Sequence, residues 1–148
     1  MIRVQREAFN VGREIAALTA GNTRIGGVAS FVGLVRDLGG LHSMTLEHYP
    51  GMTERQLEKI DAEAHRRWPL EASLIVHRYG RLEPGDPIVL TITASAHRQA
   101  AFDSCNFLMD WLKTEAPFWK REEGADGERW VAARTDDDAA RERWRETG

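Results

Sequence analysis

Two lysines in the stretch "DWLKTEAPFWKREE" (residues 110–123) are the first residues whose types and spacing suggest chemistry. Lys113 lies beside the apolar stripe of a predicted helix, so its carbon stem can be buried while its amine reaches a cleft. Pro117 ends that helix, and the two aromatic residues after it can anchor an extended segment that turns Lys120 back toward Lys113. Two neighbouring amines suit proton transfer or covalent amine chemistry. A pair of ordinary surface lysines is the alternative.

A second group of residues could bind an anion. His97 and Arg98, in "SAHRQAAF", lie where a predicted strand gives way to a helix. The first turn of a helix presents free N–H groups and the positive end of the dipole, so a phosphate or carboxylate could bind there. An arginine that merely solvates the helix start is the more common case. Arg36 ends a predicted strand in "FVGLVR", where it is either solvated or lines a groove.

Several other chemistries have no motif in this chain. The five histidines lack metal-ligand spacing, and there is no P-loop, C-x-x-C or G-x-G-x-x-G motif. Cys105 occupies an apolar helical position and is interpreted as core. A single cysteine fits a reducing compartment, so we expect a cytoplasmic protein. A net charge of -3 and the lack of a ~20-residue apolar run argue against nucleic acid and membranes. We therefore expect neither a metal nor a cofactor.

Hydrophobic periodicity and turn signals predict the elements that position these residues. In "GMTERQLEKIDAEAHRRWP", Thr53 and Gln56 are expected to form a capping box and Pro69 to end the helix. Asn10 is expected to cap an earlier helix, and Gly33 to mark a bulge or a close approach within a strand. The expected helices cover 9–21, 51–68, 98–114 and the charged end of the chain, and the expected strands cover 26–36, 43–49, 72–80, 87–95 and 129–134.

Pairs of strands that alternate with helices predict an α+β fold. The expected architecture is a mostly antiparallel sheet with helices packed on one face, with a split β-α-β arrangement as a reasonable subtype. A length of 148 residues with 42% hydrophobic content suits one domain over residues 1–148. Residues 135–148 are expected to form a charged C-terminal helix or tail.

Six stretches together carry a resemblance to a known family, over about residues 9 to 145. They are "FVGLVR", "LEHYPGMTE", "HRYGRLEPGD", "SAHRQAAF", "DWLKTEAPFWKRE" and "RWVAAR". In this order and at these spacings, the chain resembles the large, catalytic subunit of molybdopterin synthase.

The resemblance implies an activity, a partner and an assembly. The activity is a sulfur transfer of molybdenum cofactor biosynthesis, in which two sulfur atoms enter cyclic pyranopterin monophosphate to make the dithiolene of molybdopterin. The sulfur arrives as a thiocarboxylate on the C-terminal glycine of a small ubiquitin-like subunit. The implied assembly is a heterotetramer built on a homodimer of the large subunit. The implied fold is α+β with a hammerhead-like subdomain.

The resemblance also implies roles for particular residues. Lys113 and Lys120 match the two functional lysines, and Phe31 and Met109 match positions in the pocket wall. Arg134 matches a basic residue that could reach the site of the neighbouring protomer. The substrate-binding positions implied in this chain are Leu34, Val35, Arg36, His97, Arg98, Arg121, Glu122 and Arg134.

One stretch departs from the family pattern, and two other functions compete with the implied one. The connection "DLGGLHSM" after Arg36 is shorter than usual, which bears on how this loop closes over a substrate.

The first competing function is a non-catalytic scaffold for a ubiquitin-like partner, which would need a docking surface but no amines. The second is a generic phosphate-ligand binding domain, which would not depend on a protein sulfur donor.

Overall fold

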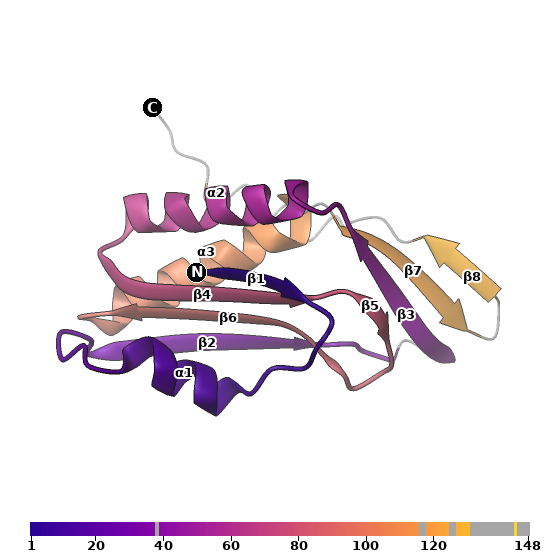
Figure 1. Ribbon diagram of the computed structural model, residues 1–148, viewed down its shortest axis with the longest axis horizontal. Helices are drawn as coiled ribbons and strands as arrows, with labels where there is room; N and C mark the ends of the chain where they lie inside the picture. Colours follow the sequence, from indigo (N-terminus) through magenta and orange to yellow (C-terminus); the bar gives the residue numbers. More distant parts are fainter. Residues whose placement is uncertain (38, 116–117, 125–126, 131–143, 145–148) are drawn as a thin grey trace.

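The first of two four-stranded sheets forms the centre of the molecule (Figure 1). The computed structural model describes residues 1–37, 39–115, 118–124, 127–130 and 144, without the side chains of 41, 42, 115, 118–124 and 127–130. The strand order of the first sheet is β1-β4-β6-β2, with β1 parallel to β4 and the other pairs antiparallel. Its strands are β1 (Ile2–Gln5), β2 (Gly27–Leu34), β4 (Leu70–Arg78) and β6 (Pro87–Ser95).

The second sheet lies beside one end of the first and is antiparallel throughout (Figure 1). Its order is β5-β3-β7-β8, and the hammerhead-like subdomain implied by the resemblance corresponds to this part of the chain. Its strands are β3 (Leu41–His48), β5 (Gly80–Leu82), β7 (Phe118–Gly124) and β8 (Gly127–Trp130).

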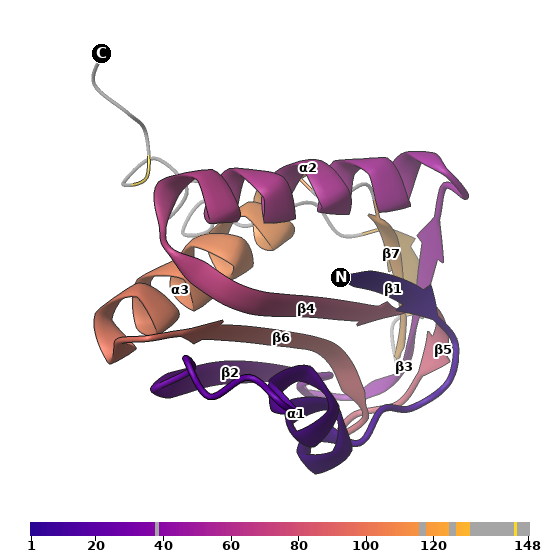
Figure 2. The ribbon, with the colours of Figure 1, turned by 60° about the vertical axis from the view of Figure 1, so that its left-hand side comes forward.

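Three helices cover the first sheet, and alternation along β4 decides which face each one takes. Ile75 packs with residues of α2 (Met52–Arg67) and α3 (Arg98–Glu115). Leu74 and Val76 point the other way and pack against α1 (Val11–Thr19). Figure 2 shows α2 and α3 on one side of the sheet and α1 on the other. The α+β class with a mostly antiparallel sheet is confirmed. The predicted placement of all helices on one face is wrong. Helices α2 and α3 share one face and α1 covers the other, because β4 is apolar on both faces.

The start of α2 differs from the predicted capping box. The helix begins after Gly51, and the carboxylate of Glu54 accepts a hydrogen bond from the Gly51 N–H at 2.6 Å. The Thr53 hydroxyl instead accepts from the Tyr49 N–H at 3.0 Å. Thr53 and Gln56 therefore do not form the capping pair, because the helix starts before Thr53. At α1 the prediction is confirmed, since the Asn10 side chain accepts from the Arg13 N–H at 3.0 Å.

Three strands have no counterpart among the predicted elements, namely β1, β5 and β7. The predicted strands at 26–36, 43–49, 72–80 and 87–95 correspond to β2, β3, β4 and β6, and the strand predicted at 129–134 overlaps β8 at its first two residues. The rest of that strand, and the predicted helix or tail at 135–148 apart from Trp144, lie outside the described residues. Within the part of the chain that is described, no helix is long and apolar enough to span a bilayer.

Candidate active site

Helix α3 presents Lys113 at its last turn. Leu108, Met109 and Leu112 are buried against the first sheet and α2, whereas Lys113 is exposed. The Thr91 hydroxyl lies 3.1 Å from the sulfur of Met109, which ties this turn to β6. The buried turn thus fixes the backbone of Lys113 against the core while its side chain is exposed, and the burial of its stem beside a cleft stays a prediction.

Strand β7 contains the "FWKRE" stretch and begins shortly after the end of α3. The helix ends at Glu115 and the strand begins at Phe118, so the chain does leave the helix at the proline and continue in extended form. In the register with β3, Lys120 pairs with Leu46, which is buried. The same register pairs Arg121 with Thr45 and Glu122 with Met44. The side chains of Lys120, Arg121 and Glu122 lie outside the described residues, so their convergence on Lys113 stays a prediction.

Arg36 follows the end of β2, and the buried residue before it, Val35, is held by two backbone hydrogen bonds. The Val35 N–H donates to the Asp86 carbonyl at 2.9 Å, and the Val35 carbonyl accepts from the Gly85 N–H at 2.7 Å. These bonds fasten the chain to the turn that precedes β6. Arg36, the next residue, is exposed. Leu34, the residue at the end of β2, is 55% exposed.

Gly33 is a point of close approach, as predicted. The register of β2 against β6 shifts between Gly33 and Leu34. A Cβ placed on Gly33 would lie 2.6 Å from Cγ1 of Val89, a separation that packed atoms do not tolerate. The missing side chain therefore lets β2 lie close to β6 just before Arg36.

The predicted pocket-wall residues come from facing elements. Phe31 on β2 pairs with Thr91 on β6, and paired residues of an antiparallel sheet share a face. Since Thr91 contacts Met109 of α3, Phe31 lies on the same side of the sheet as that helix. The Phe31 side chain is 42% exposed and Met109 is 8% exposed. That Phe31 and Met109 form the wall of a pocket stays a prediction.

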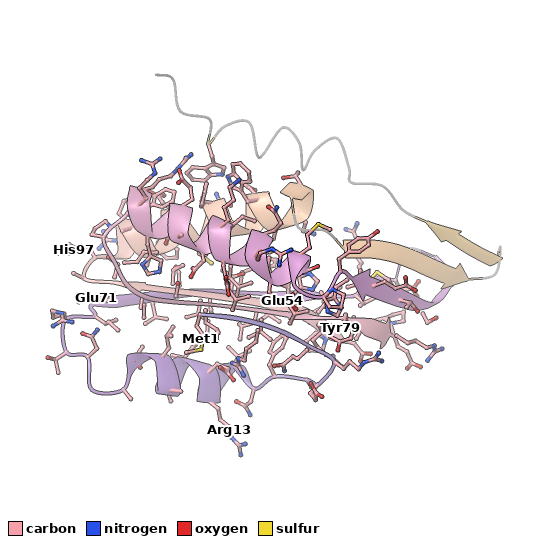
Figure 3. All side chains as sticks on the ribbon, turned by 45° about the horizontal axis from the view of Figure 1, so that its top comes forward. Met1, Arg13, Glu54, Glu71, Tyr79 and His97 are labelled. Atoms are coloured by element: carbon pink, nitrogen blue, oxygen red, sulfur yellow. The ribbon has the colours of Figure 1, made fainter. Side chains whose placement is uncertain are left out.

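His97 and Arg98 lie at the opposite end of α3 from Lys113. Figure 3 labels His97 at the end of the molecule remote from Tyr79 and Glu54. Lys113 follows Arg98 by fifteen positions in α3, which corresponds to about 22 Å at the helical rise. One chain therefore does not bring these two groups into a single site. Arg134, for which the resemblance invoked a neighbouring protomer, lies outside the described residues.

Two histidines near Lys113 were absent from the predicted site. His77, on β4, is partly buried and its Nδ1 lies 2.9 Å from the Arg78 carbonyl. Burial, together with the charges of Lys113 and His48, lowers the pKa of His77 to about 4, against the opposing effect of the bond to Arg78. Alternation along "LIVHR" places His77 on the face of buried Ile75, and this signal could have found it.

His48 joins the second sheet to this region. Its ring lies 4.1 Å from that of Tyr79, measured between centroids, and its Nε2 lies 3.8 Å from Oε1 of Glu54. His48 is at the end of β3 and Tyr79 follows β4, so both belong to the junction between the sheets. Both rings are partly buried.

Cys105 lies in the core, as predicted. It is 7% exposed and packs against Ala29 and Ala101. Burial raises the pKa of its thiol to about 11, so it is protonated near neutral pH and a poor nucleophile. Among the described residues, no group of three or more histidine, cysteine, aspartate or glutamate side chains is arranged to hold a metal ion.

A family model described as "MoaE protein" matches residues 4–115, about three quarters of the chain. The chain belongs to the MoaE family. It is 60% identical over 148 residues to the molybdopterin synthase catalytic subunit of Pseudomonas aeruginosa, covering 98% of this chain and 99% of that relative. The resemblance inferred from the six stretches is therefore confirmed.

Two solved structures show the same fold. The molybdopterin biosynthesis MoaE protein from Burkholderia ambifaria has a TM-score of 0.86 and 60% identity, with 97% of each chain covered. The second, titled as a complex of subunits 1 and 2 of the molybdopterin-converting factor from Helicobacter pylori, has a TM-score of 0.75 over 90% of this chain and 91% of that one. At 18% identity the second supports the fold alone.

Proposed function

We propose that this chain is the catalytic subunit of a molybdopterin synthase, a sulfurtransferase of molybdenum cofactor biosynthesis in the cytoplasm. The observation that carries the proposal is the full-length match to a curated catalytic subunit, together with an exposed Lys113 beside the strand that contains Lys120. The substrate is cyclic pyranopterin monophosphate. The sulfur donor is the thiocarboxylated C-terminal glycine of a small ubiquitin-like subunit.

The chemistry explains why cations are needed. The thiocarboxylate sulfur attacks a pterin side-chain carbon as a carbon–oxygen bond at that carbon breaks, giving a thioester between the partner and the pterin. The oxygen leaves on the phosphate where the cyclic phosphate opens, and as water at the adjacent carbon. Water then cleaves the acyl C–S bond, which returns a carboxylate to the partner and leaves sulfur on the pterin. Each of the two sulfurs consumes one carrier. The tetrahedral intermediate of the hydrolysis carries an oxyanion, which the ammonium of Lys113 or Lys120 can stabilise.

The remaining proposed contacts follow from charge and position. Arg36 follows the end of β2, and Arg121 and Glu122 belong to β7, which follows α3 and Lys113 in the chain; their convergence on Lys113 is part of the proposal. The substrate phosphate is an anion, and arginine forms strong charge-assisted bonds to it. Phe31 and Met109 would wall the pterin ring, and exposed Leu34 with buried Val35 would hold the strand end beside it.

We further propose that a second protomer completes each site with His97 and Arg98. These residues lie about 22 Å along α3 from Lys113, too far to act on one phosphate within a single chain. The exposed apolar side chains Phe31, Leu34 and Phe102 lie on edge strand β2 and on α3, where a second copy could cover them. The proposed unit is a homodimer within a heterotetramer, each protomer forming one domain.

Mixing two inactive variants tests the shared site. In a dimer of Lys113→Ala with Arg98→Ala, one of the two sites would hold both intact residues. Random mixing after reversible dissociation would then restore about a quarter of the wild-type activity, because half the dimers are mixed and each has one intact site of two. If both residues act within one chain, no mixture regains activity.

Reconstitution tests the reaction itself. The purified chain is mixed with the thiocarboxylated small subunit and the pterin precursor, and the product dithiolene is measured. We expect product with the thiocarboxylate and none with the plain carboxylate. A scaffold would bind the small subunit without forming product. A generic phosphate-binding domain would bind the precursor but show no dependence on the carrier.

A further inference from the structure

One face of α3 is exposed although it carries a large aromatic side chain. Phe102 is 64% exposed, and Asn106 and Lys113 follow it at helical spacing and are also exposed, so the three share a face. A different side of the helix is occupied, because Phe107 packs against Trp68, the residue that caps the end of α2. The exposed stripe of α3 therefore lies on the side away from α2.

Strand β2 borders the same side of the molecule and is exposed as well. It is the last strand in the order of the first sheet, and among the described residues no further strand pairs with its outer edge. Three of its apolar side chains, Val28, Phe31 and Leu34, are exposed. An open strand edge with apolar side chains is a template for pairing with another chain.

The strand and the helix run side by side in the same direction. A Cβ on Gly27 would lie 3.3 Å from the Cα of Arg98, near the start of both elements, and Ala29 packs with Ala101 further along. Asn106 follows Arg98 by eight positions, a rise of about 12 Å, which about 3.6 strand residues span. Asn106 is therefore level with the middle of the eight-residue strand β2.

A single two-fold axis at this level suits both elements. Two copies of an edge strand pair antiparallel over their whole length only if the axis passes through the middle of the strand. On α3 the same axis brings Asn106 close to its own copy. It also brings Phe102 level with Met109 of the second copy, since the two lie about equally far from the axis on either side. For the same reason Arg98 comes level with Lys113 of the second copy.

We propose that two copies of this chain associate through the β2 edge and the exposed stripe of α3, and that Phe102 of the second copy lies against Met109 as an aromatic wall of the site. The wall rests on the proposed function for its ligand, whereas the interface does not. A ring in that place presents its face to a flat pterin. Arg98 and Lys113 repel each other across the interface until an anion such as the substrate phosphate binds between them.

Crosslinking tests the position of the axis without turnover. Asn106→Cys places a thiol beside its own copy, and the control Lys59→Cys places one at an exposed position of α2. We expect a short bismaleimide to join Asn106→Cys into covalent dimers. Lys59→Cys and the wild type, whose Cys105 is buried, should stay monomeric on a denaturing gel. Crosslinking of Asn106→Cys no greater than that of Lys59→Cys would overturn the proposal.

Sedimentation tests the interface in a second variant. Phe102→Asp would bury a carboxylate between the two copies, so we expect it to sediment as a monomer at a concentration where the wild type is a dimer. The matched control is Met52→Asp, which changes an exposed apolar residue of α2 and should remain a dimer. A monomeric wild type, or a Phe102→Asp chain that dimerises like the control, would contradict the interface.

Precursor binding tests the wall while the two copies stay joined. In the crosslinked Asn106→Cys dimer, Phe102→Ala removes the ring without releasing the partner. Calorimetry with cyclic pyranopterin monophosphate should give a Kd raised about 2- to 10-fold, the usual effect of losing an aromatic contact. Met52→Ala in the same dimer should leave the Kd unchanged. An equal Kd for Phe102→Ala and Met52→Ala would refute the wall.

The outcomes separate this inference from the proposed function. A crosslinked dimer that neither binds the precursor nor forms product would refute the proposed function, and the wall with it, but would leave the interface standing. A chain that forms product while Asn106→Cys fails to crosslink would refute the interface and leave the reaction standing.

Discussion

Partly buried His77 makes the stability of this chain depend on pH in a way that its surroundings predict. Burial, aided by the charges of Lys113 and His48, lowers the pKa of His77 from 6.5 to about 4, although the bond to the Arg78 carbonyl acts in the opposite direction. The folded chain therefore takes up a proton at this site less readily than the unfolded chain. Stability must fall wherever the unfolded chain binds the extra proton.

The sign and size of the effect follow from the two pKa values. Above pH 6.5 the imidazole of His77 is neutral in both states, so the contribution is fully present. Between pH 6.5 and about 4, only the unfolded state is protonated, and the free energy of unfolding decreases as the pH falls. At pH 5.0 the loss amounts to about 2 kcal/mol, obtained from the ratio of the two binding polynomials.

Urea unfolding at pH 7.5 and pH 5.0 measures this contribution. Glutamine does not titrate, so His77→Gln should lose about 2 kcal/mol less than the wild type between the two pH values. The matched control is His97→Gln, which alters an exposed histidine and should keep the wild-type loss. If His77→Gln and the wild type lose the same free energy, the reasoning from burial is wrong.

Three further predictions use other parts of the chain. Lys113→Ala should abolish dithiolene formation while small-subunit affinity, measured by calorimetry, changes little; full activity would remove this lysine from the site. Native Cys105 should resist iodoacetamide at pH 8, because burial raises its pKa to about 11, and should react once urea unfolds the chain; mass spectrometry showing equal rates in both states would refute this. Gly33→Ala should lower stability by about 1–3 kcal/mol, because its Cβ would meet Val89 at 2.6 Å. The control Gly12→Ala, where the nearest atom is 3.6 Å away, should not destabilise α1, and thermal unfolding compares the two.

Local features were predictable from the sequence where the physical cause is local. The helices at 51–68 and 98–114 emerge from the spacing of apolar residues, because a helix closes its own backbone hydrogen bonds within four residues. The Asn10 cap needs only the N–H of Arg13. The capping pair of α2 was misplaced because Gly51 and Thr53 both lie at plausible starts, and propensity does not choose between them.

The strands β1, β5 and β7 were missed for a different reason. A strand obtains its hydrogen bonds from a partner that is distant in the sequence, so a short segment such as Gly80–Leu82 carries little signal of its own. Charged β7 has no apolar run, and its pairing with β3 is what makes it a strand. Local pattern therefore assigned its extended course after the proline but not its place in a sheet.

The sequence by itself determined the family, the type of fold and the residues that carry charge and amines. It did so because motif order, helical periodicity and residue chemistry are all written along the chain. Tertiary structure alone decided that β7 pairs with β3 and that His77 pairs with Val89 on the side of the first sheet that α2 and α3 cover. Those relations depend on which distant strands pair and on which face each side chain takes, and through-space packing sets both.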